Sequence, residues 1–242
     1  MTPVSTLIAK ELRCLAVSPV LYVVGAVFLF ISGFLAHLMV VNAGQQALRF
    51  LQMQNTYAPL NLNELVFRPI FHSLDIVLIF LLPMLTMRLF AEEKRLGTIE
   101  LLLTYPMRDG DLFWGKFVAC AIATLFMLSC TLVYPVIMFY LQPFDWTLVV
   151  PGYVGLVLLA LSFIACGLFI SSLTDNIVVA GLGSLGLLLF FWILSWNDGA
   201  TQFGLISTIA TVSMVTHFQN FARGLIDSKE ISKMKNGALL IN

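Results

Sequence analysis

Long apolar runs alternate with short polar segments along most of this chain. A helix of about 20 residues is needed to cross a hydrocarbon core about 30 Å thick. Five runs reach this length, and they predict membrane-spanning helices at residues 20–41, 70–89, 117–141, 148–173 and 177–196. Residues 203–216 are also apolar, but this run is too short to span and favours a re-entrant or interfacial hairpin. The pattern therefore predicts an all-α polytopic membrane protein with five clear spans.

A shorter amphipathic segment precedes the first span. Over residues 4–17 the apolar side chains fall on one helical face, and Lys10, Glu11 and Arg13 fall largely on the other. This arrangement predicts a helix that lies in the membrane interface. Ser18 can then cap the first span, with Pro19 at its first helical position.

Several residues within the spans predict local features. Pro83 and Pro135 should bend the second and third spans, because proline lacks the backbone donor that a helix needs. The polar turn at 171–176 offers capping residues to the fifth span. That span has a face of small residues that lets another helix approach closely, formed by Gly181, Gly183, Ser184 and Gly186.

Composition agrees with a membrane protein. Hydrophobic residues make up 60% of the chain and charged residues 11%, whereas soluble domains have about 45–50% and about 25%. The formal net charge is zero, which gives no reason to expect a nucleic-acid partner. The four cysteines lie in or beside apolar runs without a C-x-x-C pair, so we expect buried thiols rather than disulfides. Three scattered histidines predict no metal site, and without a Walker-type phosphate loop we expect no ATP or other cofactor on this chain.

One polar segment, residues 88–116, carries ten of the chain's 26 charged side chains between the second and third spans. Gly97 should end the incoming helix, and Thr98 can cap a short new one that Pro106 terminates. Asp109 or Asp111 can cap the helix that leads into the third span. A short helix held at the membrane surface by two spans can dock into a partner's groove through its leucines, with Glu100 pairing to a basic residue there. The alternative is a solvated loop with no partner.

Lysine and arginine counts predict the orientation. The 88–116 segment has five and the N-terminus two, while the 142–147 loop has none. Because short cytoplasmic loops carry the excess of basic residues, the N-terminus and the 88–116 segment should be cytoplasmic. The basic residues of the C-terminal tail, placed outside by five spans, do not fit this rule.

Two further groups of residues are candidates for chemistry inside the membrane. His72 and Asp75 lie in the first turns of the second span, where they could line a transport pathway or simply belong to a hydrated helix end. Ser184 with His217 loosely suggests an intramembrane hydrolase, for which loss of a proteolytic activity in Ser184→Ala would be decisive. The few ionisable groups in the spans disfavour a pathway for small ions.

The segment Met87–Pro106, followed by Gly115-Lys116, resembles the permease subunits of ABC-2 type transporters. Lys10-Glu11-Leu12 with Ser18-Pro19, and Pro83 in the second span, are similar to the same family. Residues 217–227, HFQNFARGLID, resemble its gliding-motility-associated branch. The resemblance covers residues 5–230 and implies one ABC-2 membrane domain at 1–230. The family pattern has a sixth span, whereas residues 231–242 are expected to be a divergent or truncated tail.

The resemblance implies a non-enzymatic permease of a bacterial inner-membrane exporter. Its partners would be an ABC ATPase subunit, which binds the ATP, a second permease subunit and the lipid bilayer. The implied residues of the interface helix are Lys10 and Glu11, and those of the coupling and docking region are Glu92, Glu93, Gly97, Thr98, Glu100, Leu101, Leu102, Pro106 and Lys116. A non-transporting membrane scaffold is the alternative function.

Overall fold

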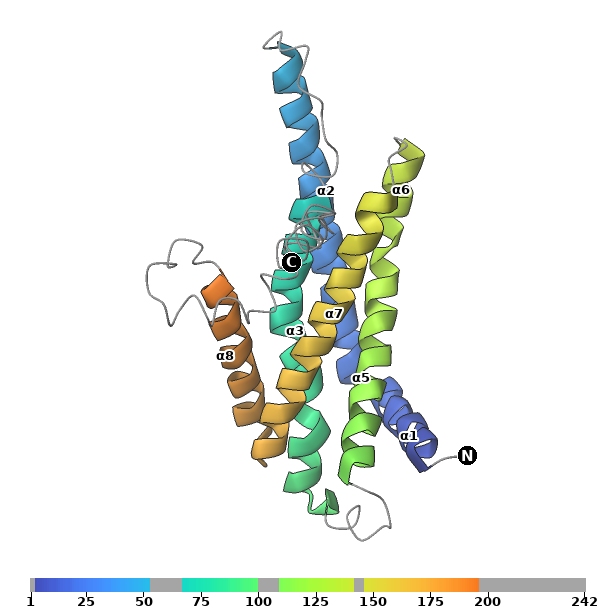
Figure 1. The fold of residues 1–242 in the computed structure, drawn as a ribbon, viewed down its shortest axis with the longest axis vertical. Coiled ribbons are helices and arrows are strands. Elements are labelled where there is room, and N and C mark those ends of the chain that lie inside the picture. Colours follow the sequence, from blue (N-terminus) through green and yellow to red (C-terminus); the bar gives the residue numbers. More distant parts are fainter. Residues whose placement is uncertain (1–2, 53–66, 100–108, 142–145, 196–242) are drawn as a thin grey trace, which may run out of the picture.

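The computed structural model describes residues 3–52, 67–99, 109–141 and 146–195. Within these ranges the chain forms helices and no strand (Figure 1), in the order α1 (Pro3–Val17), α2 (Pro19–Gln52), α3 (Arg68–Arg95), α5 (Asp109–Thr131), α6 (Val133–Leu141), α7 (Trp146–Leu173) and α8 (Ile177–Ser195). Four stretches are long and apolar enough to cross a membrane, at residues 19–46, 68–95, 110–140 and 149–173, and α8 is a shorter apolar helix. These helices confirm the predicted all-α polytopic class.

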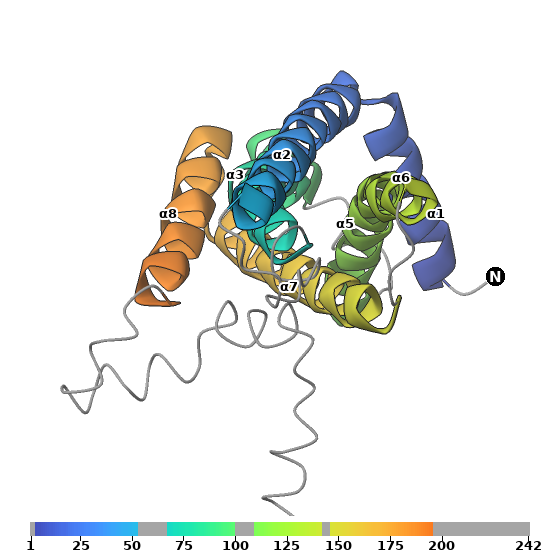
Figure 2. The same ribbon diagram turned by 90° about the horizontal axis from the view of Figure 1, so that it is seen from above.

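The helix α3 lies at the centre of the bundle. It packs against α2, α7 and α8, and it is the most buried of the four long spans. Figure 2 shows α8 on one side of the bundle and α1 on the other, where α1 packs along α5. The short helix α1 therefore packs beside the spans and does not continue α2 in a straight line, and its predicted place in the membrane interface stays a prediction.

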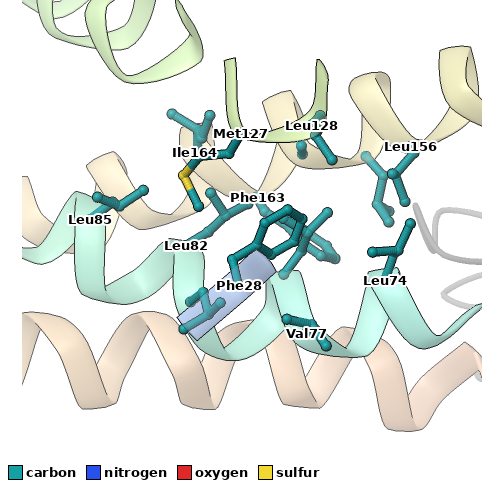
Figure 3. Packing of buried hydrophobic residues seen from close by; sticks show 14 of the residues in the cluster. Phe28, Leu74, Val77, Leu82, Leu85, Met127, Leu128, Leu156, Phe163 and Ile164 are labelled. Carbon is teal, nitrogen blue, oxygen red and sulfur yellow. The ribbon is translucent and has the colours of Figure 1, made fainter. Parts of the chain in front are cut away.

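Large side chains from three spans meet in the core. Phe28 of α2 and Phe163 of α7 are fully buried close to Leu82 of α3 (Figure 3). Lipid tails are as apolar as these side chains, so removal of apolar surface from water cannot be what holds the spans together. Close packing and interhelical hydrogen bonds must supply that stability instead.

Two helix starts follow the predicted caps. The hydroxyl of Ser18 accepts a hydrogen bond from the backbone N–H of Val20 at 3.4 Å, next to Pro19 at the start of α2. At the start of α8, the side-chain oxygen of Asn176 accepts from the N–H of Val178 at 3.0 Å. Both contacts satisfy donors that a helix leaves without a partner in its first turn.

The third span is broken where Pro135 predicts a bend. The helix α5 ends at Thr131 and α6 begins at Val133. In a regular helix the residue at 135 would donate to the carbonyl of Thr131, and proline has no N–H to do so. The hydroxyl of Tyr153, from α7, donates to that carbonyl at 3.0 Å. By contrast, α3 continues through Pro83 as one helix.

Among the described glycines, two on α7 leave the least room for a side chain. A Cβ at Gly152 would stand 2.3 Å from the ring of Phe71, and one at Gly167 would stand 2.2 Å from the hydroxyl of Thr86. On the predicted small-residue face of α8, Gly181 is also tight, with a Cβ 2.9 Å from Met87, whereas Gly186 has open space. The strongest requirement for glycine is therefore on α7, which the sequence pattern did not single out.

Candidate functional site

Four charged side chains from three helices meet beside α1, and we call them the ion-pair cluster: Lys10 and Glu11 of α1, Glu93 of α3 and Lys116 of α5. Lys116 Nζ lies 2.9 Å from Glu93 Oε1 and 3.4 Å from Glu11 Oε1. Lys10 Nζ lies 3.4 Å from Glu11 Oε1 and 3.8 Å from Glu93 Oε1. Two carboxylates thus alternate with two ammonium groups and join α1 to the ends of α3 and α5.

Burial makes Lys116 the centre of this cluster. Its side chain is 1% exposed, and its Nζ also lies 5.2 Å from the centroid of the Phe90 ring, where the face of the ring attracts a cation. Glu11 is buried as well, whereas the Lys10 side chain is 49% exposed. The second carboxylate oxygen of Glu93, Oε2, is buried and has no hydrogen-bond partner among the described residues. Removing the buried Lys116 would leave the carboxylates around it without their main cation, which costs about 3–5 kcal/mol.

The packing of α1 on α5 explains why a glycine precedes Lys116. A Cβ at Gly115 would stand 2.5 Å from a methyl group of Leu7, which is buried. Gly115 therefore lets α1 approach closely enough for Glu11 to reach Lys116. The prediction that Glu11 lies on an outward polar face of α1 is wrong, because Lys116 provides a partner inside the protein.

The end of α3 agrees with the predicted role of Gly97. Its φ is +69°, in the left-handed region that favours glycine, and its N–H donates to the carbonyl of Lys94 at 3.1 Å. The hydroxyl of Thr98 donates back to the carbonyl of Glu93 at 3.3 Å. Thr98 thus completes the end of α3. Four predicted coupling residues lie outside the described ranges: Glu100, Leu101, Leu102 and Pro106.

A second contact fixes the same end of α3 against α7. The hydroxyl of Ser171 donates to the carbonyl of Met87 at 3.0 Å and accepts from the N–H groups of Phe90 and Ala91, both at 3.2 Å. The ammonium of Lys94 also donates to the carbonyl of Ser172. The part of α3 that carries Glu93 is therefore held between α5 on one side and α7 on the other.

The remaining predicted residues are dispersed. Glu92 is partly exposed and lies 3.9 Å from Arg88, one turn earlier on α3. His72 is exposed, but Asp75 is 0% exposed, and within the described part of the chain neither of its carboxylate oxygens has a hydrogen-bond partner. The interpretation of Asp75 as a hydrated helix end is wrong for this structure, and the two side chains do not share one environment.

Sequence-based candidates for other chemistry gain no support from the geometry. The hydroxyl of Ser184 is buried and donates to the carbonyl of Ala180 on its own helix, at 2.7 Å. His217, its proposed partner in a hydrolase, lies outside the described ranges. Among the residues that the structure describes, no three His, Cys, Asp or Glu side chains are close enough to hold a metal ion.

Sequence reasoning missed how these residues pair. It assigned Lys116 and Glu93 to a docking surface and Lys10 with Glu11 to a separate interface helix. It gave Ser171 only a place in a turn. The one available signal was that a lysine and two glutamates lie near the ends of apolar runs, where a charge must either reach water or find a partner.

Comparison with protein families identified a model that covers most of the chain. The model of the ABC-2 family transporter proteins matches residues 5–223, which includes every helix described above except the first two residues of α1. Comparisons with curated proteins and with solved structures gave no match. The chain therefore belongs to the ABC-2 family of transporter proteins and is a multi-pass, membrane-spanning permease component.

Proposed function

We propose that this chain is the permease subunit of an ABC exporter and couples its movements to ATP hydrolysis on a separate ATPase subunit. The observation that carries the proposal is the ion-pair cluster. It joins α1 to the ends of α3 and α5, and these are the two helices that lead into and out of residues 97–108. A force applied to that segment would therefore reach three helices together.

The cluster and the segment would have different tasks in this mechanism. Glu100, Leu101 and Leu102 would bind the ATPase, because adjacent leucines with a nearby charge suit a groove in a partner. Lys116, Glu93 and Glu11 would not touch the partner, since they are occupied with one another inside the protein. They would instead transmit the displacement of the segment to the spans, because a buried ion pair resists separation.

Several finer features remain part of the proposal. A second permease subunit would complete the transporter, with the N-terminus and residues 97–108 on the cytoplasmic side of a bacterial inner membrane. The resemblance of residues 217–227 to the gliding-motility-associated branch would make the chain a member of that branch, and the family match itself does not separate branches. His72 and Asp75 would belong to the pathway only if another conformation brings them to a common space.

The experiment separates binding from transmission. The tagged full chain is purified gently from its host, and the ATP hydrolysis of any co-purifying ATPase is measured in liposomes. Glu100→Ala with Leu101→Ala should lose the ATPase, whereas Lys116→Met should retain it but lose the stimulation of its activity by the membrane subunit. Arg95→Ala is the control, because Arg95 is exposed near the same end of α3 and lies outside the predicted docking residues.

Two results would contradict the proposal. If the intact, folded chain co-purifies with no ATPase, the alternative of a non-transporting scaffold is favoured. If an ATPase binds but Lys116→Met and Arg95→Ala both keep full stimulation, the cluster does not transmit movement.

A further inference from the structure

A cavity of about 250 Å³ opens beside the ion-pair cluster, between α1, the start of α2, α3 and α5. One part of its wall is charged and consists of Lys10, Glu11, Arg88, Glu92, Glu93 and Lys116. The other part is apolar and includes Leu15, Val20, Leu21, Met84, Leu85 and Leu89. A charged wall and an apolar wall thus face the same space.

A second cavity, of about 630 Å³, adjoins the first. It lies between α1, α2 and α5, and its wall is almost entirely apolar. Leu15 and Leu21 line both cavities, so these two side chains separate the charged space from the apolar one. Gly25 lines the second cavity, and nothing lies within 4 Å of the place where its Cβ would be, so a larger side chain there has room to fill this space.

This arrangement matches the two halves of a phospholipid. The amphipathic helix α1 forms one wall of both cavities, and such helices lie where headgroups meet acyl chains. A headgroup in the smaller cavity would place its acyl chains next to Leu15 and Leu21, beside the larger apolar cavity. The larger volume is within the range of about 300–1,000 Å³ that ligand pockets occupy.

The charges select the kind of headgroup. The smaller cavity has three basic and three acidic side chains, so its formal charge is zero. Lys10, Arg88 and Glu92 are the most accessible of these, with side chains 49%, 41% and 38% exposed. A zwitterionic headgroup would add no net charge, with its phosphate near the two cations and its cationic end near Glu92. An anionic headgroup would leave one negative charge uncompensated in a partly dehydrated site.

Hydrogen-bond capacity distinguishes between zwitterionic lipids. Among the described residues, the partly exposed carboxylate of Glu92 has only a 3.9 Å contact with Arg88, so the wall offers an accessible acceptor with unused capacity. A primary ammonium brings three N–H donors, as a lysine does, whereas the quaternary ammonium of choline has none. We propose that the two cavities bind a phospholipid with an ethanolamine headgroup, which holds α1 in place. This binding does not depend on the proposed transport function.

The test is native mass spectrometry of the full chain, extracted from vesicles that contain equal amounts of phosphatidylethanolamine, phosphatidylcholine and phosphatidylglycerol. The ethanolamine lipid should be retained preferentially. Arg88→Gln should lower its retention about tenfold or more, which is the loss of one charge-assisted hydrogen bond. Arg13→Gln is the matched control and should change nothing, because Arg13 is exposed on α1 and lines neither cavity.

The apolar cavity has its own pair of variants. Gly25→Leu should fill it and reduce lipid retention, whereas Gly44→Leu on the same helix should not, because Gly44 is equally open but lines neither cavity. Size-exclusion chromatography and circular dichroism establish that each variant is folded. Equal retention of the three lipids, preferential retention of phosphatidylglycerol, or equal effects of each variant and its control would overturn the proposal.

Discussion

The position of Lys116 changes how the charged residues around it are interpreted. A lysine near the end of an apolar run normally extends its flexible stem toward water. This one is 1% exposed, because Glu93 and Glu11 supply acceptors inside the protein. Its charge is therefore used to join three helices and is not available to a partner.

Replacing Lys116 should be far more damaging than replacing Lys10. Lys116→Met leaves the buried carboxylate of Glu11 and the partly buried carboxylate of Glu93 without their main cation, so we expect the free energy of unfolding to fall by about 3–5 kcal/mol. Lys10→Met removes a half-exposed member of the same cluster and should cost about 1 kcal/mol or less. Unfolding of both variants in mild detergent, monitored by circular dichroism, measures the difference between their free energies of unfolding. Equal losses would show that Lys116 has no special role.

At the scale of elements, α3 and α7 are joined by backbone proximity. Gly152 and Gly167 let α7 lie against Phe71 and Thr86 of α3, and Ser171 then reaches the backbone of α3 near its end. Small residues at a contact are how helices gain close packing inside a lipid bilayer. These two helices should therefore move as one unit.

Adding a single methyl group at this contact should weaken the unit. In Gly167→Ala the new Cβ would stand 2.2 Å from the hydroxyl and 2.8 Å from the Cβ of Thr86, which is fully buried and has little room to move. Overpacking of this kind costs about 1–3 kcal/mol. Gly44→Ala, where nothing lies within 4 Å, should instead be neutral or stabilising by about 0.4–1 kcal/mol. The same unfolding measurement compares them, and a stable Gly167→Ala would contradict the close contact.

At the scale of the whole molecule, the charged contacts gather at one end of the bundle. The ion-pair cluster, Gly97 and the contact of Lys94 with Ser172 all lie where α3 ends and α5 begins. The start of α7 lies toward the opposite end (Figure 1). If basic residues mark the cytoplasmic side, the two ends face different compartments.

Cysteine labelling can determine this orientation. In a chain whose four native cysteines are replaced by alanine, Leu96→Cys and Trp146→Cys place single thiols at exposed positions of the two ends. A membrane-impermeant thiol reagent should label Trp146→Cys in intact cells and Leu96→Cys only after the cells are opened. Labelling of Leu96→Cys in intact cells would reverse the predicted orientation.

Within the described residues, the sequence by itself determined the helical class, the positions of the long apolar helices and where several of them begin. Helix starts, ends and breaks depend on local backbone geometry, which residues close in the sequence determine. The length of each apolar run acts in this way, and so do Ser18, Gly97, Asn176 and Pro135. It also located the family motif around 87–116. Only the tertiary structure decided which charges meet, because Glu11, Glu93 and Lys116 are far apart in the chain and pair only once α1 packs against α5. The burial of Asp75 and the hydrogen bond of Ser171 to the backbone of α3 likewise depend on which helix packs against α3, and no local pattern encodes that choice.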